Sequence, residues 1–243
     1  MAWFERKLEE KNTRIYILEQ DGERIGQARV DLEGQNGEIS YALCLRARGH
    51  GYSKWMLGSI EEELREQAVC RKLIAEVKRE NIASQKIFET LSYIAVPADY
   101  GYVFEKKIPL FTIIMCTYNS AQTLATAVES VRNQEFGGWE MQILDNGSKD
   151  ESVEKLQEYE KSDDRIKCIY RKDNIGWGKG ISECLKTSAG GYMMFLGADD
   201  YLATEHTLTE VADEVKKNHP QIIFTGTYYA KYEQGEYLSL IHI

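Results

Sequence analysis

Short apolar strands alternate with helices along the second half of the chain, and this alternation restricts the fold more than any other feature. Strands are expected at 111–116, 140–144, 166–170 and 192–196, and helices at about 119–134, 150–159 and 180–187. We expect Asn119 or Ser120 to cap the first of these helices. Strands joined in this way form a parallel sheet, and nucleotides bind at the carboxyl ends of such strands.

The first half follows a different order. Asp21-Gly22 lies between two apolar runs, which is a strong signal for a β-hairpin. Strands are expected at 14–18, 24–30, 38–44, 72–77 and 102–107, and helices at 54–67 and 81–91. The fold class predicted for the chain is therefore α/β, with a mixed sheet in the first domain and a Rossmann-like parallel sheet in the second.

The chain is expected to divide near residues 107 and 108. Pro109 interrupts strand pairing there. The charge balance also changes, from 17 Lys and Arg against 18 Asp and Glu up to Lys107 to 13 against 21 beyond it. We predict a first domain over 1–107 and a second over 108–237. Residues 238–243 resemble the translation of a sequencing adapter, so a non-native tail is predicted there.

Composition excludes several classes of protein. Hydrophobic residues make up 43% and charged residues 28% of the chain, as in ordinary globular proteins. The acidic second half argues against a nucleic-acid partner, and no apolar run approaches the ~18 residues of a membrane span. Residues 1–4 pass directly into charged Glu5, so no secretory leader is expected, and neither the five cysteines nor the four histidines have metal-site spacing. A cytoplasmic location with reduced thiols is predicted.

A glycine-rich turn follows the third strand of the first half. Glycines let such a turn fold tightly, so that its N–H groups can converge on a pyrophosphate at the positive end of the next helix. A tight strand-to-helix turn that binds nothing is the alternative. The residues predicted to bind phosphate are Arg46, Arg48, Gly49, His50, Gly51, Tyr52 and Ser53.

Together with Asn81-Ile82-Ala83-Ser84, this turn resembles the GNAT family of N-acetyltransferases, whose pattern is Arg/Gln-x-x-Gly-x-Gly, a strand, and then Asn-x-x-Ser. The resemblance implies acetyl-CoA as cosubstrate, with Asn81 near the cofactor arm. Phrases such as Ile25-Gly26-Gln27 look most like members that acetylate amino groups on nucleotide-linked sugars, so an amino sugar or another amine is the expected acceptor. The family's first strand and the helices after it are expected to be missing.

One departure from the family concerns a proton. Many members carry a tyrosine seven positions after the asparagine, which protonates the departing thiolate, but here that position is Phe88. Water or another group would have to replace it, a change that could cost up to the ~10²–10⁴-fold typical of a general acid. The base for the amine is not evident: Glu38, Ser40 and Glu76 lie on the relevant strands, but carboxylates at strand ends are more often solvated. Asn81 and Glu76 are the predicted catalytic residues.

Carboxylates follow two apolar strands of the second half. Asp145 follows one, and the pair Asp199-Asp200 follows another. Paired carboxylates at the edge of a parallel sheet suit Mg²⁺ or Mn²⁺ bridging to phosphate. Helix capping by Asp200 is the alternative.

Residues 112–119, 144–150, 174–179 and 195–200 resemble, in order and spacing, the family 2 glycosyltransferases with the GT-A fold. The resemblance implies a nucleotide-sugar donor and a divalent cation. It assigns roles as follows: Thr117 and Tyr118 border the base and ribose, Asp145 reads the nucleoside, Asp199 contacts the ribose or metal, and Asp200 sits at the metal-diphosphate site. Lys179 would lie near phosphate or on a solvated helix face.

Here too there are departures. Asn146 replaces an aspartate that many members carry, which leaves donor preference open, and Gly197 replaces the first acid of Asp-x-Asp. The family's carboxyl half, with the base that activates the acceptor, is expected to be absent. We predict a fused glycosyltransferase and N-acetyltransferase of surface-polysaccharide or glycoconjugate synthesis, which would meet a membrane only through a lipid-linked acceptor. The alternative is a binding or scaffold module of two degenerate domains.

Overall fold

The computed structural model describes residues 12–223, 228–233 and 236–241. The chain divides into two compact units, one of residues 1–114, 138–142 and 185–194 and the other of residues 115–137, 143–184 and 195–243. The bounds of the two predicted domains stay a prediction. Of the predicted tail, residues 242–243 lie outside the described part of the chain.

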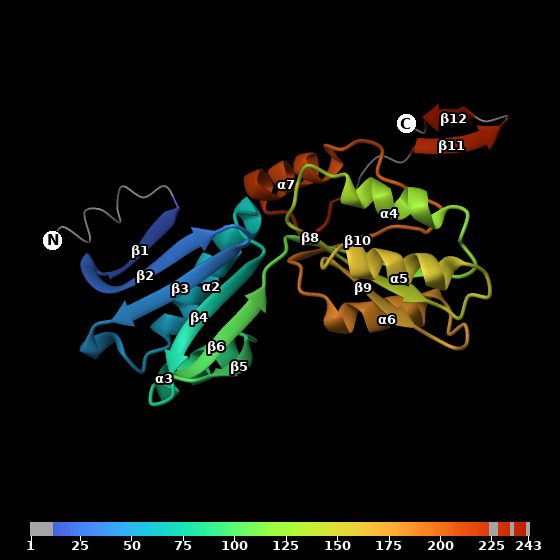
Figure 1. The fold of residues 1–243 in the computed structure, drawn as a ribbon. Coiled ribbons are helices and arrows are strands. Elements are labelled where there is room, and N and C mark those ends of the chain that lie inside the picture. The colour runs from blue at the N-terminus through green and yellow to red at the C-terminus, as the bar shows by residue number, and fades with distance from the viewer. Residues whose placement is uncertain (1–11, 224–227, 234–235, 242–243) are drawn as a thin grey trace. The chain divides into compact units, whose positions relative to one another are not determined.

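A six-stranded mixed sheet forms the first half (Figure 1). Its strand order is β1-β2-β3-β4-β6-β5, and only the β3–β4 pair is parallel. The turn between the first two strands has positive φ at both Asp21 and Gly22, as a tight hairpin requires. The elements are β1 (Thr13–Gln20), β2 (Glu23–Glu33), β3 (Asn36–Leu43), a 3₁₀ turn η1 (Leu45–Ala47), α2 (Tyr52–Gln67), β4 (Lys72–Lys78), α3 (Ile82–Thr90), β5 (Ile94–Ala98) and β6 (Gly101–Lys107).

One face of this sheet carries the core. Along β3, Gly37, Ile39 and Leu43 are buried while Glu38 and Ser40 are exposed, the alternation of a sheet covered on one side. Helix α2 supplies the opposing apolar side chains to this core. The covered face therefore holds the fold together, and the polar face is free for other uses.

β3 and β4 separate halfway along their length. They pair only at Asn36–Lys72, Gly37–Leu73 and Glu38–Ile74, after which β3 continues to Leu43 beside β2 and β4 continues to Lys78 beside β6. A gap, which we call the β3–β4 gap, thus opens between 39–43 and 75–78. The glycine-rich turn and the start of α3 both follow strands that border it.

The second sheet has the order β10-β7-β8-β9. Its strands run parallel, because the N–H of Leu110 donates to Gly138 where β7 and β8 begin, and the N–H of Asn146 donates to Thr117 where they end. Every residue of β8 is buried, as expected for a strand covered on both faces. The elements are β7 (Phe111–Thr117), α4 (Leu124–Arg132), β8 (Trp139–Asp145), α5 (Ser152–Ser162), β9 (Ile166–Tyr170), α6 (Trp177–Thr187), β10 (Tyr192–Phe195) and α7 (Thr207–Asn218).

The α/β fold class, with a mixed sheet followed by a parallel one, is confirmed. The predicted start of α4 is wrong: the helix begins at Leu124 after Thr123, and Asn119 takes a left-handed φ of 52° in the preceding turn. Strand β5 was not expected because it contains Pro97, which an edge strand tolerates. A separate hairpin pairs β11 (Tyr228–Glu233) with β12 (Glu236–Ile241). Among the described helices, none combines the length and apolarity needed to cross a bilayer.

Candidate functional site

The glycine-rich turn has the geometry of an anion site. Gly49 and Gly51 both have φ of 81°, a left-handed conformation that favours glycine, and Gly51 is the N-cap of α2. Within the described part of the chain, the N–H groups from Gly49 to Lys54 have no hydrogen-bond acceptor in the turn or helix. These donors, at the positive end of a 16-residue helix, suit a phosphate.

The side chains of the turn contribute less. Arg46 is exposed and forms an ion pair with Glu23. Hydrogen bonds to Cys44 and then to Glu23 raise the pKa of Arg46. Arg48 donates from Nε to the Leu43 carbonyl at 3.3 Å. Of the remaining predicted residues, His50 is exposed, Tyr52 is half-buried and Ser53 is buried.

The start of α3 lies across the β3–β4 gap from β3. Asn81 caps α3, since its Oδ1 accepts a hydrogen bond from the Ser84 N–H at 3.2 Å. The Ser84 hydroxyl is in turn 3.1 Å from the Tyr41 hydroxyl of β3. Asn81 thus has a structural role, and its place at the gap leaves its predicted catalytic role untested.

The candidate bases share the polar face of the sheet. Glu38, Ser40 and Glu76 are all exposed there. Desolvation, a hydrogen bond to Glu76 and the charges of Glu76 and Glu38 raise the pKa of Tyr100. A cavity with a volume of about 240 Å³ includes Ser40 but neither glutamate, and it is lined by Ile15, Gln27, Ala28, Arg29, Ser40, Tyr41 and Ala42.

The second site follows from strand order. The chain passes from β7 to β8 and β9 on one side and then to β10 on the other, so the carboxyl ends of β7 and β10 flank a switch point, where ligands bind in open parallel sheets. Thr117 ends β7 and is 1% exposed, and its hydroxyl has no hydrogen-bond partner in the described structure. Tyr118, next along the chain, is 49% exposed.

Asp145 organises the loop that follows β8. Its Oδ2 accepts hydrogen bonds from the N–H groups of Gly147 and Ser148, both at 3.0 Å, and the Ser148 hydroxyl donates to Oδ1. The carboxylate is 1% exposed. Asn146 is also buried, and its Oδ1 accepts from the Ile175 N–H at 3.2 Å. These contacts fix the loop, and the role of Asp145 toward a nucleoside stays a prediction.

Asp199 and Asp200 lie together after β10. The N–H of Asp200 donates to the Gly197 carbonyl at 3.1 Å, which closes a turn. A Cβ at position 197 would lie 2.8 Å from Asp199 Oδ1 and 2.6 Å from Asp200 Oδ2. The two exposed carboxylates therefore fold over Gly197, and their hard oxygens suit a divalent cation. A side chain at position 197 would require these two carboxylates to shift.

An aromatic pair near the switch point could not be found from the sequence. The rings of Trp177 and Phe195 are 6.3 Å apart, with 64% and 54% of each residue exposed. Trp177 also approaches β7, because its carbonyl is 3.8 Å from Cys116 Sγ. Exposed aromatic rings suit stacking on a base or a sugar. Lys179, one turn into α6, is exposed.

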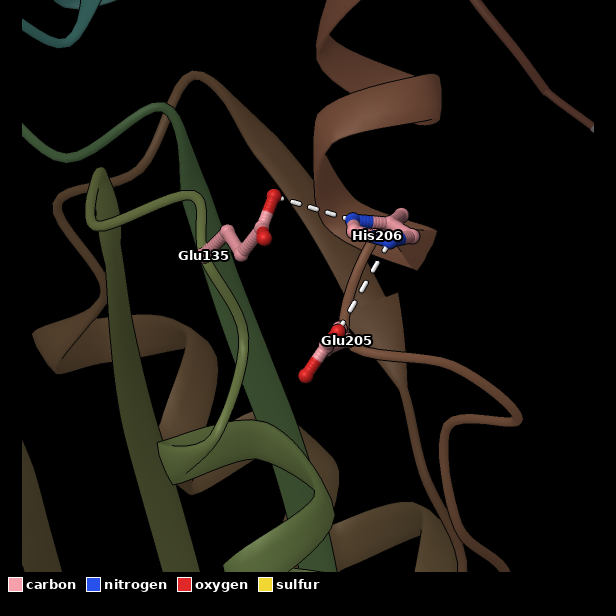
Figure 2. Close-up of side chains that lie close together, drawn as sticks. All are labelled: Glu135, Glu205 and His206. Atoms are coloured by element: carbon pink, nitrogen blue, oxygen red, sulfur yellow. Dashed lines mark hydrogen bonds and ion pairs between the residues drawn. The ribbon is translucent and has the colours of Figure 1, made fainter.

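A histidine and two carboxylates also meet on the surface (Figure 2). His206 Nδ1 is 2.9 Å from Glu135 Oε2, and Nε2 is 3.7 Å from Glu205 Oε1. Nearby, the buried Gln134 side chain donates to the Thr204 carbonyl at 2.6 Å and accepts from the Leu208 N–H at 2.9 Å. We interpret the three exposed residues as part of this contact between the end of α4 and the start of α7.

Two family models match the chain. The model described as "Glycosyl transferase family 2" matches residues 112–243, and the one described as "Acetyltransferase (GNAT) family" matches residues 1–93. The first match covers more than half of the chain and contains Thr117, Asp145, Asp199 and Asp200. The second contains the glycine-rich turn and the start of α3.

Curated relatives match part of the chain. One, from Bacillus subtilis (strain 168), is described as a teichuronic acid biosynthesis glycosyltransferase (TuaG) and is 37% identical over 92 residues, which is 38% of this chain and 36% of the relative. A glycosyltransferase of Haemophilus influenzae is 31% identical over 123 residues, 51% of this chain and 38% of the relative. The chain thus spans less than half the length of these relatives.

Solved structures resemble parts of the chain. S. aureus TarS 1–349 in complex with UDP-GlcNAc is 27% identical, with a TM-score of 0.42, over 45% of this chain and 32% of that one. A GNAT-family acetyltransferase from Streptococcus pneumoniae is 14% identical, with a TM-score of 0.39, over 44% of this chain and 73% of that one.

Proposed function

We propose that this chain, which belongs to glycosyl transferase family 2 and also carries an acetyltransferase (GNAT) family domain, binds a nucleoside-diphospho sugar and contributes to transfer of the sugar to an acceptor hydroxyl. The observation that carries the proposal is the pair of carboxylates folded over Gly197, at the switch point of a parallel sheet. Because the chain covers under half of its relatives, the complete reaction is part of the proposal.

Each residue at this edge has a proposed task. Asp199 and Asp200 hold Mg²⁺ or Mn²⁺, which supplies charge neutralisation for a departing diphosphate. The Thr117 hydroxyl, buried without a partner, donates to the base or ribose. Tyr118 borders the same part of the nucleotide, and Asp145 contacts the nucleoside from the loop that it organises.

Donor binding tests this proposal directly. Calorimetric titration of the full chain with UDP-GlcNAc should show binding that strengthens in the presence of Mn²⁺. Asp200→Asn should abolish the Mn²⁺-dependent part. Asp213→Asn is the matched control, because the Asp213 side chain is exposed on α7, and this variant should bind the donor like the unaltered protein. Donor binding that is unaffected by both Mn²⁺ and the Asp200 substitution would refute the metal-diphosphate assignment. Repeating the titration with UDP, GDP and dTDP sugars would identify the donor.

A second activity is supported by the amino-terminal half. We propose that it binds acetyl-CoA with the free N–H groups after Gly49, and that Asn81 lies near the cofactor arm. The acceptor is an amine, with an amino sugar first, and Glu76 is the proposed base because it faces the same polar side of the sheet as the 240 Å³ cavity. Acetyl-CoA binding that is lost in Gly49→Trp would support the site.

Together the two activities suit the synthesis of a modified surface polysaccharide. A cytoplasmic location belongs to this proposal, in keeping with the five cysteines, none of which forms a disulfide in the described part of the chain. The rival function is a scaffold that binds neither ligand. The scaffold would be supported if neither acetyl-CoA nor any of the nucleotide sugars bound in the titrations above.

A further inference from the structure

The departing thiolate of an acetyl thioester needs a proton, and the β3–β4 gap offers few donors. Phe88 of α3 has no hydroxyl. Its ring is 2% exposed, stacked on Phe104 at 5.5 Å and in edge contact with Tyr93 at 4.9 Å. The proton must therefore come from water or from a side chain of another element that lies near Phe88.

Tyr41 of β3 reaches this position from the opposite side of the gap. Its ring meets the Phe88 ring edge-on, with centroids 6.1 Å apart and planes at 73°. Its hydroxyl is 3.1 Å from Ser84 Oγ, and either oxygen can be the donor in that contact. When Ser84 donates, the Tyr41 proton is free to point elsewhere.

Two other tyrosines of this half, Tyr93 and Tyr100, are less suitable. The Tyr93 hydroxyl lies in the core, where burial and then Glu61 raise its pKa far above the usual range. Desolvation, and then the neighbouring Glu76 carboxylate, raise the pKa of Tyr100, which makes its hydroxyl a weaker acid. Tyr41 and its hydrogen-bond partner Ser84 are both half-buried, so a proton can pass from solvent through their hydroxyls to the gap.

We propose that Tyr41 is the catalytic acid of the acetyl transfer, an inference that rests on the acetyltransferase function proposed above. The acceptor nitrogen bonds to the thioester carbon, and the carbon–sulfur bond breaks with its electron pair going to sulfur. The Tyr41 proton passes to sulfur. Ser84 then returns a proton to the phenolate and regains one from solvent. The proton that the acceptor nitrogen loses passes to Glu76, the proposed base, and from there to solvent. The products are an amide and the CoA thiol.

Tyr41→Phe in the full chain tests the proposal, because it keeps the ring and removes the hydroxyl. With acetyl-CoA and D-glucosamine as probes, the rate of thiol release should fall about 10²-fold, with the Kd for acetyl-CoA unchanged. Adding Phe88→Tyr should recover at least about tenfold of the rate, since it restores a hydroxyl beside the same ring. Tyr16→Phe is the matched control: it removes a tyrosine hydroxyl 3.3 Å from Glu63, away from the gap, and should leave the rate unaltered.

A binding measurement separates this inference from the proposed function. The unaltered chain should prefer CoA to desulfo-CoA about tenfold, and Tyr41→Phe should lose that preference, whether or not D-glucosamine is accepted. If the chain bound acetyl-CoA but Tyr41→Phe retained both the rate and the preference, the role of Tyr41 would be overturned and the proposed function would stand. If the chain bound no acetyl-CoA, both would fall.

Discussion

Two buried threonine hydroxyls on β7 have opposite hydrogen-bonding states. Thr112 donates to Glu140 Oε1 at 2.7 Å and accepts from the Gly190 N–H at 2.9 Å. Thr117, at the other end of the strand, has no partner for its hydroxyl. A buried polar group without a partner costs about 1–3 kcal/mol, so Thr117 is expected to serve a ligand while Thr112 serves the fold.

We therefore predict opposite effects of the same substitution at these two positions. Thr117→Val should raise the free energy of unfolding by about 1 kcal/mol and weaken UDP-sugar binding about tenfold, whereas Thr112→Val should lower the free energy of unfolding by about 1–3 kcal/mol. Urea titration and calorimetry measure both quantities. Equal destabilisation by the two substitutions would contradict the distinction.

Gly197 is constrained by closeness rather than by backbone angle. Gly197→Ala should push the Asp199 and Asp200 carboxylates apart and lower Mn²⁺ affinity about tenfold, because the new Cβ would lie within 2.8 Å of both. Gly58→Ala in α2 is the control, since its Cβ would meet only Leu91 Cδ2, at 4.0 Å. It should be neutral or slightly stabilising. Manganese titration followed by electron paramagnetic resonance decides, and unchanged affinity in Gly197→Ala would argue against a cation between these carboxylates.

The sequence predicted some site residues better than others. Asp199 and Asp200 are adjacent in the chain, so a local pattern was enough to pair them. Trp177 and Phe195 meet only because α6 and β10 fold together, and Glu135 and His206 are 71 residues apart. Sequence spacing does not predict such tertiary contacts. The spacing of the histidines therefore did not indicate that His206 lies beside Glu135.

At the scale of elements, one ionised residue links two helices with a strand. Asp163 ends α5 just before β9, and its carboxylate accepts hydrogen bonds from Arg165 Nε at 2.9 Å and Nη2 at 2.6 Å. Arg132, at the end of α4, lies 3.7 Å away. Burial alone would raise the pKa of Asp163, but the hydrogen bonds from Arg165 and the charges of Arg165 and Arg132 outweigh it, and the pKa is lowered.

This lowered pKa gives a pH-dependent stability. A carboxylate with a depressed folded pKa stabilises the fold above its unfolded pKa of about 3.9, and that contribution is lost as pH falls through the folded value. Asp163→Asn should therefore cost about 2 kcal/mol at pH 7, and the difference from the unaltered protein should shrink steadily below pH 4. Denaturant titrations at pH 7, 5 and 3 test this. A difference of the same size at pH 3 and pH 7 would sink it.

The strands that the sequence predicted end within a few residues of their observed ends, whereas β5, β11 and β12 were not predicted and the start of α4 was misplaced. The predicted strands are runs of apolar residues, which are visible in the sequence and become buried on folding. The start of α4 depends on Asn119, which looks like a cap in sequence. Its side chain instead accepts from the Lys149 N–H at 2.7 Å, across the loop after β8. Competition between a local cap and a distant donor is settled only in the folded chain.

At the scale of the whole molecule, the first half has an apolar core of its own. The cluster around Leu57 and Leu73 draws on residues 18–108 only. Ile108, which was expected to open the second domain, is 1% exposed and belongs to this core. Separate cores favour separate cooperative units of unfolding.

Calorimetry should accordingly resolve two thermal transitions. Acetyl-CoA should raise the temperature of one, and UDP-GlcNAc with Mn²⁺ should raise the other. Each ligand should add about 2.7 kcal/mol to the free energy of unfolding of the unit that binds it when the ligand is present at 100 times its Kd. A single transition moved by both ligands would contradict independent units.

The early separation of β3 from β4 leaves peptide groups at 39–43 and 75–78 without partners across the β3–β4 gap. An extended ligand can take the place of a missing strand between such strands. It pairs with them through main-chain hydrogen bonds that do not depend on side-chain identity. Substitutions along the edges of the gap would then alter packing while sparing recognition. Hydrogen–deuterium exchange of these backbone amides should be fast without a ligand and slow with an extended ligand bound. The amides that become slow identify the peptide groups that form hydrogen bonds to the ligand.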